Sequence, residues 1–116
     1  FQVMEALMRV MPARAVLDWC LRGTDLPVAQ ALSYGLITHA CPREAVGATV
    51  DQILAEVVAQ SPAAIRLGLE AYDQLRRDPP ANPQAYLQQM LLRCLQTPDA
   101  REGMQAFREG RPPVWS

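Results

Sequence analysis

Histidine, cysteine pairs and net charge are all in short supply in this sequence, and each shortage argues against a class of function. His39 is the only histidine, and the three cysteines, Cys20, Cys41 and Cys94, contain no Cys-x-x-Cys pair. A metal site is therefore not expected, because zinc needs three or four such ligands at suitable spacing. The formal net charge is −1, so no basic excess suggests a nucleic-acid partner and no acidic run suggests an interaction tail.

Long apolar runs and targeting signals are also absent from this sequence. No stretch approaches the roughly 20 consecutive apolar residues that a membrane-spanning helix needs, and no secretory signal is visible. Three widely separated cysteines suit reduced, buried thiols in a protein of the cytosol. With 116 residues, of which half are hydrophobic and a fifth charged, the chain can bury the core of one domain. We therefore expect a cytoplasmic protein with neither a membrane nor a nucleic acid as its partner.

What the sequence does contain is helical periodicity. Apolar residues recur every three or four positions along most of it, and proline, glycine or a capping residue bounds each periodic segment. Pro12 either ends or only kinks the first segment. The segments that we expect to be helical are 1–11, 13–22, 28–34, 44–60, 62–77, 83–96 and 98–109. With residues 1–22 counted as a single helix kinked at Pro12, the pattern predicts a mostly α fold with five or six helices.

One stretch in the first third of the chain departs from this periodicity. Gly23 ends a helix, because a residue without a Cβ adopts the left-handed conformation easily, and Gly35 ends the short alanine-rich helix that follows. Residues 36–41 then read as one short strand, closed by Pro42. A lone strand leaves its backbone groups without partners, so it predicts a sheet supplied by sequence missing here or by another chain. Phe1 also lies inside a helical pattern without a cap, and we interpret the chain as a fragment.

No residue in the sequence stands out as a catalytic group. As a general base, His39 would need a nucleophile or an orienting acid nearby, and no such spacing is visible. We interpret it as a partly buried structural residue of the strand. The twelve aspartates and glutamates fall mostly on polar helix faces or in caps. A carboxylate needs burial to raise its pKa towards the working pH, so these acids are not expected to perform acid–base chemistry.

Three short motifs, in order along the chain, carry a resemblance to a known family. The first is Leu21-Arg-Gly23 with Ala29-Gln-Ala31, Tyr34-Gly-Leu-Ile37 and Pro42; the second is Gln60-Ser-Pro-Ala-Ala-Ile65; the third is Asp99-Ala-Arg-Glu-Gly-Met-Gln-Ala-Phe-Arg-Glu-Gly-Arg-Pro-Pro113. Together they span nearly the whole chain, and they resemble motifs of the crotonase (enoyl-CoA hydratase/isomerase) superfamily. That family often has a Leu-Thr-Gly-Arg turn, an "SP.A" helix start and a "D..EG..AF.EKR.P" tail.

The resemblance implies that this chain is the C-terminal helical region of a crotonase-like α/β fold. Residues 1–35 would lead into the Gly-Leu-Ile strand, and residues 43–116 would cover the active site and pack the trimer. The β-rich catalytic core, with an oxyanion hole of two backbone N–H groups and the proton-transferring acids, would lie upstream of Phe1. The resemblance therefore places no catalytic residue in this chain, and the fragment alone would be inactive.

For the complete protein, the resemblance implies hydration or a double-bond shift of an acyl-CoA thioester through an oxyanion-stabilised enolate, as in fatty acid metabolism. Coenzyme A (CoA) would be part of the substrate, and no covalently bound cofactor is implied. The partners would be the missing N-terminal portion and further copies, in a trimer or a dimer of trimers. The acyl chain, and the choice among hydratase, isomerase and other crotonase reactions, stay open.

Three residues in or near the tail motif are candidates for contact with CoA. In several family members the aromatic residue of this motif reaches the CoA of a neighbouring subunit, and Phe107 matches it. Arg111 matches the arginine of the motif, and Arg108 lies one turn before it; either could meet a phosphate. The lysine of the motif falls on Gly110, and the lysine that follows "SP.A" falls near Leu69, so neither lysine contact carries over.

Alternatives stay open from the residues alone. Phe107 could pack in a core or an interface, and Arg108 and Arg111 could be surface charges or partners of a helix C-terminus. The whole chain could be a non-catalytic helical module that binds a protein through its apolar faces. It could also be a relative of the family that kept the fold and lost catalysis.

Overall fold

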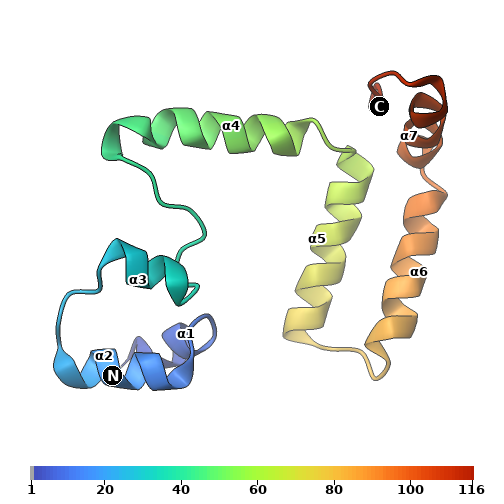
Figure 1. The fold of residues 1–116 in the computed structure, drawn as a ribbon. Helices are drawn as coiled ribbons and strands as arrows, with labels where there is room; N and C mark the ends of the chain where they lie inside the picture. The colour runs from blue at the N-terminus through green and yellow to red at the C-terminus, as the bar shows by residue number, and fades with distance from the viewer. Residues whose placement is uncertain (1) are drawn as a thin grey trace. The chain divides into compact units, whose positions relative to one another are not determined.

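The computed structural model describes residues 2–116, and the regular structure in this part of the chain is helical (Figure 1). It comprises α1 (Met4–Met8), α2 (Ala13–Arg22), α3 (Val28–Ser33), the 3-10 helix η1 (Arg43–Ala45), α4 (Val46–Val58), α5 (Pro62–Arg77), α6 (Pro83–Leu95) and α7 (Pro98–Glu109). The mostly α fold class is confirmed. The seven α-helices of residues 2–116 exceed the expected five or six, because Pro12 ends one helix and precedes the next instead of kinking a single one.

The strand expected at residues 36–41 is wrong for the part of the chain described here, where these residues are irregular. The backbone N–H groups of Leu36 and Ile37 donate instead to the carbonyl of Ala31, at 2.9 Å and 3.4 Å, and close the end of α3. A strand needs a second backbone alongside it, and none of residues 2–116 forms one. His39, expected to be partly buried, is exposed in this segment.

The thiols are also more exposed than expected. Cys20 on α2 and Cys41 after α3 are exposed, so the expectation of buried thiols is wrong for these two residues. Cys94 on α6 is half-buried and packs against a core, as expected. The reason is that helical periodicity shows on which face of a helix a residue lies, whereas neighbouring elements decide whether that face is buried.

The described chain divides into two compact units, and the division falls inside α4. In the first unit, which reaches Thr49, α1 packs against α2, and the buried side chains are Met11, Val16 and Ala31. The second unit, from Val50 onwards, is built around α5 and α6, which lie side by side and run in opposite directions (Figure 1). The candidate site belongs to this second unit.

The core of the second unit lies where α5 and α6 face each other, and α7 packs against both helices. Its members are Leu67, Ala71 and Met90, with Tyr86 and Cys94 packed against them. At the surface of the same interface, the guanidinium of Arg93 is 2.7 Å from the carboxylate of Glu70. Apolar burial stabilises the pair of helices, while this half-exposed ion pair adds little.

The last three helices begin in the same way, as the sequence predicts. Ser61, Asn82 and Thr97 each precede a proline, and the side-chain oxygen of each accepts a hydrogen bond from the backbone N–H three residues later, at 3.0 Å, 3.0 Å and 3.1 Å. Proline suits the next position, because its missing N–H would have no partner in the first turn. These caps fix where α7 starts, and therefore which of its side chains face outward.

α4 is amphipathic, yet it buries no residue. Val46, Val50, Leu54 and Val57 share one face and are each between 45% and 55% exposed, and Val58 is 76% exposed. Apolar residues at this spacing and in this number usually pack against another surface. The apolar face of α4 is therefore available for packing.

Candidate functional site

The candidate site lies on α7, because its two faces have different surroundings. Asp99 and Ala106 are seven residues apart, about two turns, and are 3% and 1% exposed on the face towards the rest of the second unit. Met104 lies on the opposite side and is 46% exposed, and Phe107 lies about a quarter turn round the helix from the buried face and is 87% exposed. A phenylalanine left this open is unusual, so the outward face of α7 is a candidate contact surface.

Asp99 fixes the start of α7 against α5. Its carboxylate accepts hydrogen bonds from the backbone N–H of Ala63 (3.0 Å) and the hydroxyl of Ser61 (2.7 Å), both at the N-terminus of α5, and from the hydroxyl of Ser116 (2.9 Å). The pKa of Asp99 is lowered, most by the hydrogen bond from the Ala63 N–H and less by those from the two serine hydroxyls. A buried carboxylate with these partners stays ionised, so Asp99 is an anchor and not a general base.

Arg111 turns the tail back along α7. Its Nη1 and Nη2 donate to the two carboxylate oxygens of Glu102, at 2.6 Å and 3.1 Å, and its Nε donates to Glu109 at 2.5 Å. Glu102 also accepts a hydrogen bond from the backbone N–H of Val114, at 2.8 Å. The pKa of Glu102 is lowered to about 2, chiefly by the Arg111 guanidinium and less by the Val114 N–H. The pKa of Arg111 is raised, chiefly by Glu102 and less by Glu109.

Trp115 completes the contact between the tail and α7. Its indole N–H donates to the carbonyl of Ala59 at 2.8 Å, just after α4. Its ring lies against Gly103, where an added Cβ would be 3.4 Å from the nearest ring carbon. The Glu-Gly pair of the tail motif is thereby explained: the acid binds the arginine of the tail, and the glycine leaves room for the indole.

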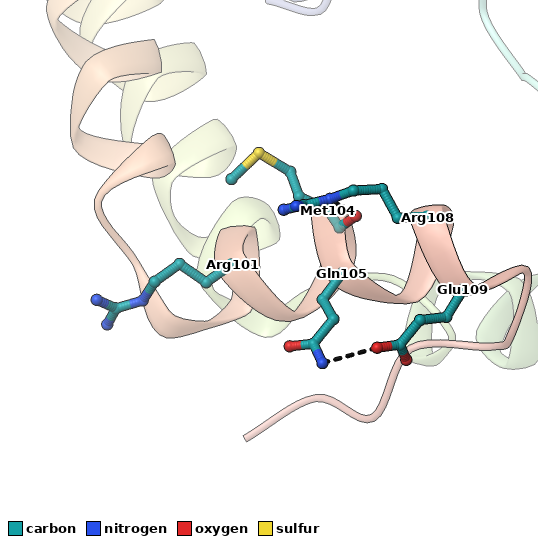
Figure 2. A pocket seen from close by; sticks show the side chains of 5 residues that line it. All are labelled: Arg101, Met104, Gln105, Arg108 and Glu109. Carbon is teal, nitrogen blue, oxygen red and sulfur yellow. Dashed lines mark hydrogen bonds between the residues drawn. The ribbon is translucent and has the colours of Figure 1, made fainter.

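A shallow depression of about 430 Å³ lies on the outward face of α7 (Figure 2). Its lining residues all belong to this helix: Arg101, Met104, Gln105, Arg108 and Glu109. The Arg108 side chain folds back along the helix, and its Nε donates to the carbonyl of Met104 at 3.2 Å. Because one helix supplies every wall, a bound ligand would need a second surface to enclose it.

Two arginines give this depression its charge. Arg101 and Arg108 form no ion pair among residues 2–116, whereas Arg93 and Arg111 are held by carboxylates. The acid of the depression, Glu109, shares Arg111 with Glu102, and the two arginines outnumber this one acid in the lining. Both guanidinium groups therefore keep N–H groups that can bind an anion, since only the Nε of Arg108 is used, by the carbonyl of Met104. Arginine binds phosphate through parallel N–H bonds.

The three residues predicted to contact CoA are not brought together by the structure. Arg108 lines the depression, Phe107 stands exposed on an adjoining strip of α7, and the guanidinium of Arg111 is occupied by Glu102 and Glu109. Their contacts with CoA stay predictions.

The two positions that match lysines of the family motifs are Gly110 and a site near Leu69. Gly110, at φ +65°, takes the left-handed conformation that ends α7, which glycine adopts at least cost. Leu69 is 63% exposed on α5.

Sequence reasoning missed Arg101 and Met104. The signal was present, because Arg101, Met104 and Arg108 follow at intervals of three and four residues and so share a helical face. Among residues 2–116, no three His, Cys, Asp or Glu side chains gather so as to hold a metal ion. Within the same range, no helix has the length and apolar character needed to cross a bilayer.

Comparison with known proteins defines the class. The enoyl-CoA hydratase/isomerase family matches residues 1–116, the whole chain. The chain therefore belongs to the enoyl-CoA hydratase/isomerase (crotonase) family, as the three sequence motifs predict.

Curated relatives are longer than this chain. The mitochondrial enoyl-CoA hydratase domain-containing protein 3 of Rattus norvegicus is 31% identical over 114 residues, which cover 96% of this chain and 37% of the relative. The carnitinyl-CoA dehydratase of Citrobacter koseri is 26% identical over 113 residues, which cover 94% of this chain and 43% of that protein. The chain thus spans about two fifths of the length of these relatives.

Solved structures give the same result for the fold. An enoyl-CoA hydratase of Mycobacterium smegmatis aligns with a TM-score of 0.85 and 25% identity over 97% of this chain and 44% of its own. An enoyl-CoA hydratase of Mycobacterium tuberculosis H37Rv aligns with a TM-score of 0.79 and 26% identity over 97% of this chain and 45% of its own. The helices therefore align to part of the crotonase fold.

Proposed function

We propose that this chain is the C-terminal helical region of an enzyme that acts on acyl-CoA thioesters. Residues 1–35 would lead into the β-rich core of the intact protein, and residues 43–116 would cover its active site and pack its subunits. The family match along the whole chain, and its partial coverage of longer relatives, support this assignment. The reaction would be hydration of an enoyl-CoA or a shift of its double bond, with the enolate oxygen held by backbone N–H groups of the core.

The observation that carries the proposal is the outward face of α7. An 87% exposed phenylalanine lies next to a single-walled depression that contains an arginine without an ion-pair partner among residues 2–116. The CoA moiety offers an adenine ring and phosphates, which match Phe107 and Arg108 in chemistry. We assign the adenine to Phe107 and a phosphate to Arg108, with a neighbouring subunit closing the depression.

These contacts would act far from the reacting carbons of the substrate. An interaction that is equally strong in the bound substrate and in the transition state lowers KM without raising kcat. We therefore expect Phe107 and Arg108 to contribute to affinity for the CoA thioester and little to the chemical step. Proton transfer would be performed by residues of the core.

The apolar surfaces of the chain support subunit packing. The face of α4 is exposed, and an apolar groove of about 240 Å³ lies between α5 and α6, lined among others by Leu67, Leu87 and Leu91. We propose that the β-rich core and further copies of the protein cover these surfaces, in a trimer or a dimer of trimers. A cytoplasmic location is proposed from the reduced cysteines alone.

Steady-state kinetics of the intact protein with an enoyl-CoA test the proposal. Phe107→Ala and Arg108→Gln should each raise KM about five- to tenfold and change kcat less than about twofold. Arg66→Gln removes the same charge from an exposed site on α5 and should leave both constants unchanged. Equal KM values for all four proteins would overturn the CoA contacts, and turnover by the 116-residue chain alone would overturn its role as a non-catalytic region.

A second candidate is a helical module that binds a protein and has no catalytic parent. The exposed apolar face of α4 favours it, because such a face suits any apolar partner. Absence of turnover and of CoA binding by the intact protein, together with a stable complex with another protein, would support this reading. Binding of CoA without turnover would instead indicate a family relative that kept the fold and lost catalysis.

A further inference from the structure

Arg101 is a cation that forms no ion pair within residues 2–116. It lies on the same face of α7 as Arg108, seven residues earlier, which places the two Cα atoms roughly 10 Å apart along the helix. Figure 2 shows its side chain extending away from the other four lining residues, while Arg108 folds over the middle of the depression. The face therefore presents one cation at the end of the depression and another in its centre.

Two separated cations fit a ligand that carries two separated anionic groups. CoA has this pattern: a diphosphate within the molecule, and a terminal phosphate on the 3′ oxygen of the ribose. The floor between the two arginines contains Met104, whose polarisable thioether makes favourable contacts with aromatic rings such as adenine. The one acid in the depression, Glu109, is held by Arg111, which also pairs with Glu102, and accepts a hydrogen bond from Gln105, so it opposes a bound anion less than an unpaired carboxylate would.

We propose that Arg101 binds the 3′-phosphate of CoA and thereby sets the specificity of the site, while Arg108 binds the diphosphate. This inference rests on the proposed function. Its consequence is selectivity: a thioester carried on CoA is preferred over the same acyl group on dephospho-CoA or on phosphopantetheine, because both of these lack the 3′-phosphate. Arg101 is a binding residue that lies outside the chemical step.

The test is isothermal titration of the intact protein with CoA and with dephospho-CoA. Arg101→Gln should weaken CoA binding about tenfold and leave dephospho-CoA binding unchanged, so that the two ligands bind alike. Arg101→Lys keeps the charge and should retain part of the preference. Arg108→Gln should weaken the binding of both ligands, and Arg66→Gln should weaken neither.

The outcomes separate this inference from the proposed function. If Arg101→Gln prefers CoA over dephospho-CoA as strongly as Arg66→Gln does, the proposed role of Arg101 is overturned. In that case, weaker CoA binding by Arg108→Gln would still support the CoA site of the proposed function. If Arg101→Gln, Arg108→Gln and Phe107→Ala all bind CoA as the unaltered protein does, the proposed function fails as well. Circular dichroism of each variant shows whether its helices are retained.

Discussion

Glu102 and Arg111 meet in a two-point ion pair, with Nη1–Oε1 and Nη2–Oε2 distances of 2.6 Å and 3.1 Å. They are nine positions apart in the sequence, so the pair turns the tail back along α7. Trp115 then covers Gly103, and its indole N–H reaches the carbonyl of Ala59. The acid, the glycine and the arginine of the tail motif therefore share one role, which is to hold the tail against α7.

Arg111→Gln should release the tail while α7 itself stays folded. The substitution removes both bonds to Glu102, and Val114 then loses the fixed carboxylate that accepts its N–H. We expect hydrogen exchange at the Val114 amide to become at least about tenfold faster, measured by NMR. Arg108→Gln removes an arginine that holds no part of the tail and serves as the control. Unchanged protection at Val114 in Arg111→Gln would contradict this account of the tail.

Glu102 should make the free energy of unfolding depend on pH. Its pKa falls from the usual 4.5 to about 2 in the folded protein, chiefly through Arg111. Because the folded pKa lies below the unfolded one, this stabilisation is fully present above about pH 5 and is lost as the pH falls from about 4.5 to 2. Asp99, whose pKa is also lowered, acts in the same direction.

Urea unfolding between pH 2 and 7 measures this effect. The free energy of unfolding should fall less steeply with acid in Glu102→Gln than in the unaltered protein. Glu44→Gln removes an exposed carboxylate that forms no ion pair among residues 2–116, so its curve should run parallel to that of the unaltered protein. Parallel curves for all three proteins would show that Glu102 is not held as described.

Gly103→Val should displace Trp115. An added Cβ already sits 3.4 Å from the indole, and the two methyl groups of valine would overlap it. We expect the free energy of unfolding to be about 1–3 kcal/mol lower than in the control Gly68→Val. A Cβ at Gly68 meets nothing within 4 Å, and both variants change the helix propensity in the same way. Thermal unfolding gives the difference, and tryptophan fluorescence reports exposure of the indole. Equal stability and fluorescence in the two variants would contradict the packing of Trp115.

Local features of the fold were predictable from the sequence, because neighbouring residues decide them. Ser61, Asn82 and Thr97 each precede proline, and each caps a helix as expected. Gly23 has φ +58° and ends α2, again as the sequence predicts. The family was predictable for a similar reason, since three motifs in order identify it and the match covers the chain.

Contacts between distant residues were not predictable from the sequence. Asp99 reads as a first-turn acid of its own helix, and nothing local shows that it also caps α5 through Ser61, 38 residues earlier. The strand at residues 36–41 failed because its extended pattern depends on a partner backbone that residues 2–116 lack. Arg111 matched a motif, yet its partners Glu102 and Glu109 emerge only once the tail folds back.

Leu67 and Leu69 provide the sharpest test of which face of α5 is the core. Both are leucines of the same helix, but Leu67 is 5% exposed against Met90, and Leu69 is 63% exposed. In the 116-residue chain, Leu67→Ala should cost about 2–4 kcal/mol and Leu69→Ala less than about 0.5 kcal/mol, measured by urea unfolding. Equal costs in this chain would contradict the packing of α5 on α6. In the intact protein, a cost for Leu69→Ala that rises towards that of Leu67→Ala would show that another subunit or the β-rich core covers this face, as the proposed assembly requires.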